Sequence, residues 1–166
     1  QYLLNSSYFK DRFVQRGSAH LNNTFSVERI NNIVDSLANA IDLEMPRHIN
    51  RWGGEGGISS MDSWVNELDE IKQFAENRST IVQNQIMDEL SLEGVVQITV
   101  NVSPPGAGKI MVNDVPLINE EGTGNYFKNK PLNINAYALP GHRFVGWESI
   151  SDSSILNYNC VEDTVF

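Results

Sequence analysis

The chain has 166 residues, of which 40% are hydrophobic and 20% are charged, a composition typical of globular proteins. Its net charge of −9 argues against nucleic acid as a partner, because non-specific binding to phosphates needs a basic face. No apolar run approaches the roughly eighteen residues of a membrane-spanning helix, so no membrane span is predicted. The single cysteine, Cys160, cannot form an internal disulfide and lacks partners for a zinc site.

Residues 1–92 are predicted to be helical, because their apolar residues follow the 3.6-residue period. The clearest segment is "FSVERINNIVDSLANAI", where Ser26 is a candidate N-cap and Phe25 and Ile30 form a hydrophobic staple. The expected buried face of this helix consists of Ile30, Ile33, Val34, Leu37, Ala38 and Ile41. An upstream helix, with looser spacing, is expected in "YFKDRFVQRGSAHL".

Two more helices are expected further along, in "SSMDSWVNELDEIKQFAENR" and in "TIVQNQIMDEL". Ser59 and Asp62 match the capping-box pattern at the start of the first. Its expected buried stripe consists of Met61, Trp64, Val65, Leu68, Ile71 and Ala75. The carboxylates between these positions are interpreted as a solvated face.

Between these helices, "EMPRHINRWGGEGG" concentrates charged and aromatic residues in a short stretch. One interpretation is a charged catalytic corner around a substrate. The alternative, which we favour, is a short helix with an apolar edge, ended by Gly53 and Gly54. Its polar residues would then clamp a neighbouring helix or loop through charge-assisted hydrogen bonds. The candidate clamp residues are Glu44, Arg47, His48, Arg51 and Trp52.

After Gly94 the hydrophobic period changes to two, which predicts strands. "VVQITVNVS" is the clearest strand, "PPGAG" is a turn, "KIMV" is its return strand and "ND" is another turn. Further strands are expected in "LNINAYA" and "RFVGWE". The predicted fold class is therefore α+β, with an all-α region at 1–92 followed by a small antiparallel all-β module at 93–166.

The chemical motifs are weak. "SPPGAGKI" lacks both the first glycine and the Ser or Thr of a phosphate loop. His20, His48 and His142 lack metal-ligand spacing, so no metal site and no catalytic residue is assigned. The candidate ligand-binding aromatics of the β module are Tyr126, Tyr137 and Trp147, although aromatic side chains in small sheets more often fill the core.

Residues 3–54 resemble the C-terminal helical part of the CotH kinase family, a divergent protein-kinase-like fold. The resemblance is carried by "F..RF..R....LN.TFS", by "MPRHI.RW" and by a later helix of the form "FA..R...V...I". The second half resembles the divergent internalin-type B-repeats of bacterial surface proteins, which are β-grasp-like modules. Gly141, Phe144, Gly146 and Trp147 match their "G-x-x-F-x-G-W" signature, and "VEDTVF" extends the likeness.

The kinase resemblance implies that ATP and magnesium bind a lysine and several aspartates that precede this segment in the family. No counterpart of those residues is found here, so no cofactor is expected in this chain. We therefore expect a non-catalytic C-terminal fragment, truncated at both ends, whose partner is the missing N-terminal kinase region. Both resemblances imply a bacterial extracellular or cell-envelope location. The alternative function is a cell-surface module that binds a glycan or a protein through exposed aromatics.

Overall fold

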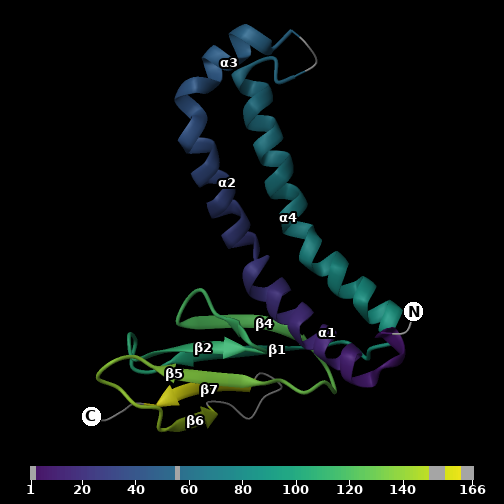
Figure 1. Cartoon of the computed structure of the whole chain (residues 1–166), viewed down its shortest axis with the longest axis vertical. Coiled ribbons are helices and arrows are strands. Elements are labelled where there is room, and N and C mark those ends of the chain that lie inside the picture. Colours follow the sequence, from purple (N-terminus) through teal and green to yellow (C-terminus); the bar gives the residue numbers. More distant parts are fainter. Residues whose placement is uncertain (1–2, 55–56, 150–155, 162–166) are drawn as a thin grey trace. The chain divides into compact units, whose positions relative to one another are not determined.

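The computed structural model describes residues 3–54, 57–149 and 156–161. The side chain of Cys160 and the last five residues of the "VEDTVF" motif lie outside the described part of the chain. Helices precede strands along the chain (Figure 1), which confirms the predicted α+β class. The chain forms two compact units. Gln1–Thr24 and Val82–Phe166 form the β unit, and Phe25–Ile81 form the helical unit.

The helical unit is a hairpin of two long helices joined by short ones. In chain order its elements are α2 (Val27–Ile41), the 3-10 helix η3 (Asp42–Glu44), α3 (Met45–Trp52) and the first two thirds of α4 (Met61–Leu90). The helices α2 and α4 lie side by side and run in opposite directions (Figure 1). An ion pair of 2.6 Å between Lys72 Nζ and Asp35 Oδ1 joins them.

Helix capping decides where these helices begin. Ser26 caps α2 as predicted, since its hydroxyl accepts a hydrogen bond from the backbone N–H of Arg29. The cap of α4 is one residue later than predicted. Ser60, and not Ser59, accepts the backbone N–H of Ser63 at 3.0 Å.

The prediction of two separate helices over 61–90 was wrong, because α4 is continuous. Residues 76–82 contain neither glycine nor proline, so no residue interrupts the backbone hydrogen bonds there. The two expected segments are separated at Ser79, which is followed by a second hydroxyl residue, Thr80. Such residues are tolerated inside a helix when its flanking turns pack.

The β unit contains one long N-terminal helix, the end of α4 and two small sheets. Its helical elements are η1 (Leu3–Asn5), α1 (Ser7–Ala19) and the π-helical η2 (His20–Thr24). The first sheet has the order β4-β1-β7-β6, with β1 (Val95–Val102), β4 (Glu121–Phe127), β6 (Gly146–Ser149) and β7 (Leu156–Val161). The second has the order β3-β2-β5, with β2 (Gly108–Val112), β3 (Val115–Pro116) and β5 (Ile134–Ala138).

All described strand pairs are antiparallel except β1–β7, which is parallel. The expected hairpin between 95–102 and 108–112 does not form, because β2 pairs with β3 and β5 in the other sheet. The "PPGAG" segment therefore carries the chain from one sheet to the other. The apolar side chains of β1 and β2 can then share a core between the sheets.

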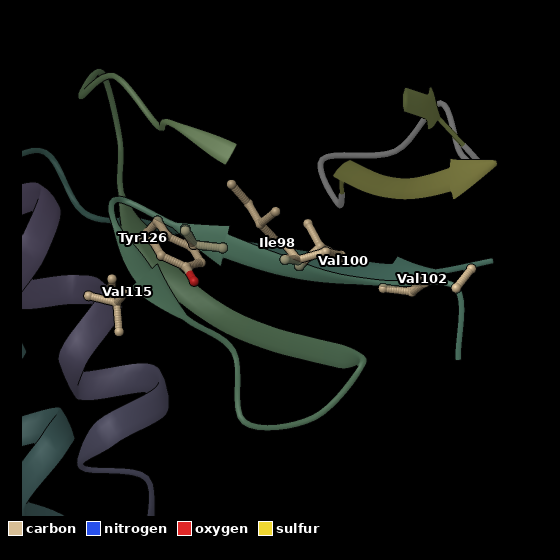
Figure 2. Close-up of a cluster of buried hydrophobic side chains, with 9 residues drawn as sticks. Ile98, Val100, Val102, Val115 and Tyr126 are labelled. Carbon is tan, nitrogen blue, oxygen red and sulfur yellow. The ribbon is translucent and has the colours of Figure 1, made fainter. Parts of the chain in front are cut away.

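The core lies where these inward-facing residues meet. Figure 2 shows Ile98, Val100 and Val102 along β1, with Tyr126 and Val115 in the same cluster. The buried members are Ala19, Ile98, Val100, Val102, Ala107, Ile110, Val112, Val115 and Tyr126. Ala19 belongs to α1, so this helix contributes directly to the core of the strands.

The predicted "ND" turn is confirmed as a two-residue hairpin between β2 and β3. Val112 pairs with Val115, and the intervening Asn113 and Asp114 have φ of 49° and 63°. Positive φ at both central residues defines a type I′ turn, which asparagine and aspartate tolerate better than most residues.

Candidate functional site

The predicted clamp residues lie on α3 and immediately before it. Pro46 is placed in the first turn of this helix, where its missing N–H has no intrahelical partner to lose. Met45 is buried, whereas His48, Arg51 and Trp52 are exposed. The described contacts of the cluster are local. Arg47 Nη1 lies 3.8 Å from Glu44 Oε2 on the preceding turn.

A second local contact joins Arg51 and Trp52, because the guanidinium lies 4.9 Å from the centroid of the indole ring. The structure thus brings together Glu44 with Arg47, and Arg51 with Trp52. His48 shares neither contact. In the described part of the chain the cluster presents exposed cations and an indole ring, and no nucleophile–base pair is assembled around them.

The end of α3 explains the first glycine of the "WGG" sequence. The N–H of Gly53 donates to Ile49 O at 2.8 Å, and a Cβ at this position would lie 3.1 Å from Ile58 O. The chain therefore returns close to the helix end, and a side chain at Gly53 would press on that backbone. Gly54 has open space around its Cβ direction.

The candidate aromatics of the β unit have different environments. Tyr126 is only 6% exposed and fills the core. Burial raises the pKa of its hydroxyl to about 12, and a hydrogen bond with Asn22 partly opposes this rise. Tyr126 therefore contributes to packing and does not form part of a surface. This agrees with the alternative given from the sequence, in which the aromatic side chains of the small sheets fill the core.

Tyr137 and Trp147 lie on different sheets. Tyr137 is 55% exposed on β5, whereas Trp147 on β6 is half-buried against the core. Phe144 packs edge-to-face on Trp147, with ring centroids 5.5 Å apart. The structure does not gather the three predicted aromatics into one platform.

Sequence reasoning missed an uncovered surface on the helical unit, which we name the apolar face. Its members were mostly predicted to be buried, but each is between 45% and 65% exposed. They are Ile33, Leu37, Ile41, Ile71, Phe74 and Ile81. Val65 is also exposed, so the predicted buried stripe of α4 holds only in part; Ala75 is its fully buried member among the described residues. The hydrophobic period predicted which segments are helical, but it did not predict which of their apolar residues are buried.

A shallow depression of about 440 Å³ runs along α4 beside this face. It is lined by Glu70, Gln73, Phe74, Asn77, Arg78 and Ile81. Arg78 leans over Phe74, with 5.6 Å between the guanidinium carbon and the ring centroid. The lining thus combines an aromatic ring with one acid and one base, all on one helix.

Within the described ranges, no group of three or more His, Cys, Asp or Glu side chains is arranged to hold a metal ion. Among the helices described, none combines the length and the apolar character needed to cross a bilayer.

Comparison with known proteins gives one match. Residues 1–82 match the family model described as CotH kinase protein. No curated protein and no solved structure matches the chain. Strands β1–β7 lie outside the matched segment, and nothing in the comparisons supports the internalin-type repeat. The matched segment takes in the whole helical unit together with α1 and η2, so this helical part of the chain is similar to the CotH kinase family.

Proposed function

We propose that residues 1–82 are the C-terminal helical part of a CotH-like kinase domain, acting as a scaffold without phosphoryl-transfer chemistry of its own. The match to the CotH kinase family over residues 1–82 carries this proposal. The sequence adds support, because it contains no glycine-rich loop leading into a helix and no catalytic-loop motif with later metal-binding aspartate. ATP and magnesium would then bind the catalytic part, N-terminal to this segment in the same protein.

The α3 corner is the surface that we propose to contact the catalytic part. Leu43 is 93% exposed and Trp52 is 48% exposed, next to the cations Arg47 and Arg51. An exposed indole and leucine beside arginines form a composition common in protein interfaces. The clamp proposed from the sequence would then act on the catalytic part, in addition to its local contacts.

Two measurements test the scaffold role. Addition of ATP and magnesium to this chain should produce neither a thermal shift nor incorporation of labelled phosphate. A CotH-like kinase that retains its catalytic residues serves as the positive control. A reproducible thermal shift or autophosphorylation of this chain alone would contradict the proposal.

A binding assay tests the α3 corner. The separately produced catalytic part of the same protein should bind this chain, and Arg47→Glu with Trp52→Ala should weaken binding at least tenfold. Asn50→Ala, also exposed on α3, is the matched control and should leave the affinity unchanged. Equal affinity of all three proteins would remove the corner from the interface.

We also propose export to the bacterial cell envelope, on the grounds of the two sequence resemblances. Fractionation of cells that produce the whole protein tests it. Recovery in the envelope or culture medium is expected, and recovery with the cytosolic enzymes would contradict export.

A second candidate function is recognition of a glycan or protein by the β unit, as a divergent internalin-type repeat carrying Gly141, Phe144, Gly146 and Trp147. The exposure of Tyr137 favours it, since exposed aromatic rings stack on sugars and anchor interfaces. A glycan array and a cell-surface pull-down should then lose signal with Tyr137→Ala. Tyr8→Ala, an exposed tyrosine on α1, is the control.

A further inference from the structure

The apolar face of the helical unit leaves several large hydrophobic side chains exposed to water. It combines six exposed aliphatic or aromatic residues, and Phe74 is the largest, with 65% of its side chain accessible. Contiguous apolar patches of this kind mark interaction sites in globular proteins. The described residues of the hairpin bury only Met45 and Ala75 fully among their apolar side chains, so the unit lacks a core of its own.

Helix geometry places the whole apolar face on one side of the hairpin. Val34 on α2 is half-buried and Ala75 on α4 is buried, so we infer that these positions lie on the sides where the two helices face each other. Ile33 and Phe74 each precede these residues by one position, a rotation of about 100°. Because both helices are right-handed and run in opposite directions, this rotation carries both side chains to the same side. Asp35, which follows Val34, pairs with Lys72 on the other side.

The charges around Phe74 have a symmetric arrangement. Glu70 lies four residues before Phe74 and Arg78 lies four residues after it, in the same depression. Each charge is therefore about 6 Å along the helix from the ring, in opposite directions. An identical helix in antiparallel orientation, related by a two-fold axis at Phe74, would bring each Glu70 opposite the Arg78 of the other copy. A parallel copy would bring Glu70 against Glu70.

We propose that the apolar face is a self-association surface, on which a second copy of this chain packs antiparallel about Phe74. Such an interface is isologous, so one set of residues serves both copies. The two hairpins together form a four-helix arrangement, in which the apolar strips of both α2 helices and both α4 helices are buried. Two Glu70–Arg78 pairs then fix the register, and Arg78 keeps its contact with Phe74.

The first test is the mass of the full chain in solution, measured by light scattering and sedimentation equilibrium. We expect twice the chain mass at concentrations near 100 µM, falling toward one chain mass on dilution. Phe74→Glu should give one chain mass at every concentration. Because Phe74 is mostly exposed, this variant should retain the helical circular dichroism of the wild type.

The second test separates this pairing from any other association. Glu70→Arg and Arg78→Glu should each weaken dimerisation at least tenfold, because each brings like charges together across the two-fold axis. The double variant, with both charges exchanged, should recover the wild-type dissociation constant to within threefold. Glu76→Arg makes the same charge change on the opposite side of α4 and should leave dimerisation intact.

Two outcomes would overturn the proposal. A wild-type chain that stays monomeric at 100 µM would leave the apolar face to another occupant, such as the catalytic part of the kinase-like domain. A dimer that the double variant fails to restore would show that Glu70 and Arg78 do not face each other. Neither outcome bears on the ATP and phosphate-incorporation assays, so the scaffold role is judged separately.

Discussion

The side-chain amide of Asn22 forms two hydrogen bonds with the backbone of Asn125. Asn22 Nδ2 donates to Asn125 O at 2.7 Å, and the N–H of Asn125 donates to Asn22 Oδ1 at 3.0 Å. The amide thus replaces the peptide group of a neighbouring strand at the free edge of β4. Gln83 Nε2 donates to the same carbonyl at 3.1 Å. Two helical elements therefore close an edge that would otherwise be open to strand pairing.

The first prediction concerns Asn22. Asn22→Ala removes both bonds to β4, and we expect it to lower the free energy of unfolding by about 1–2 kcal/mol, as partly exposed hydrogen bonds do. Urea unfolding measures the change, and hydrogen exchange of the Asn125 amide should accelerate. Asn39→Ala, at an exposed position of α2, should leave both unchanged.

Gly124 supplies an independent check of the same contact. A Cβ at this position would lie 2.7 Å from Asn22 Cγ, so Gly124→Ala should also destabilise the β unit. With Asn22→Ala in the background, the contacts with Asn22 Cγ and Nδ2 are removed and only the one with Cβ at 2.9 Å remains, so the cost of Gly124→Ala should fall in part. Strictly additive losses in the double variant would contradict the coupling.

The helix-to-strand order was predictable because it depends on local period and capping. Ser26, the alternation of β1 and the Asn113–Asp114 turn each have a signature within a few residues. The hydrogen bonds formed by the amide side chain of Asn22 in η2 have no such local signature. Asn22 and Asn125 are separated by 103 positions, and the type of neither residue indicates which part of the chain it contacts. The role of α1 and η2 as part of the β unit could not be inferred from such a sequence.

The candidate site was predictable to a similar degree. The spacing around Arg47 correctly indicated a short helix that ends near Gly53. The apolar face was missed for a physical reason. An amphipathic period indicates which residues form the apolar face of a helix. It does not indicate whether the surface that buries this face belongs to the same chain. Ile33 and Ile71 therefore looked like core residues and are exposed in this structure.

The second prediction concerns Asn113, which is 1% exposed and whose side chain joins α1 to the residue that precedes β5. Its Nδ2 donates to Gln15 O at 2.9 Å, and its Oδ1 accepts from Asn133 N at 2.9 Å. Asn113→Ala leaves both partners unsatisfied and places alanine at positive φ. We expect the free energy of unfolding, measured with urea, to fall by about 3 kcal/mol.

Asn113→Gly is the matched control for backbone strain. It removes the same hydrogen bonds but adopts positive φ freely, so it should be more stable than Asn113→Ala by about 1 kcal/mol. If Asn113→Ala lost less than about 1 kcal/mol in total, the buried amide would not hold α1 to the sheet.

The third prediction concerns pH. The pKa of Tyr126 is raised to about 12 by burial, above the ordinary value of 10.0 that the phenol has in an unfolded chain. As pH rises through this window the unfolded state loses the proton first and binds fewer protons than the folded state. Stability from Tyr126 is therefore present below pH 10 and is lost toward pH 12, by roughly 2 kcal/mol.

Urea midpoints measured from pH 9 to pH 12 test this dependence. Tyr126→Phe should flatten the alkaline loss of stability, because the buried ring then has no proton to lose. Tyr137→Phe, at the exposed tyrosine of β5, should leave the slope as in the wild type. Parallel slopes for all three proteins would show that Tyr126 does not control the alkaline limit.

The fourth prediction returns to the glycine pair that follows α3. A Cβ at Gly53 would lie 2.7 Å from Ile49 O and 3.1 Å from Ile58 O, whereas one at Gly54 would meet nothing within 4 Å. Gly53→Ala must therefore shift backbone and should lower the free energy of unfolding of the helical unit by about 1–3 kcal/mol. Gly54→Ala should be neutral or slightly stabilising, because it restricts the unfolded chain without a clash. Thermal unfolding followed by circular dichroism at 222 nm compares them, and equal effects at both positions would contradict the close approach of Ile58 to the end of α3.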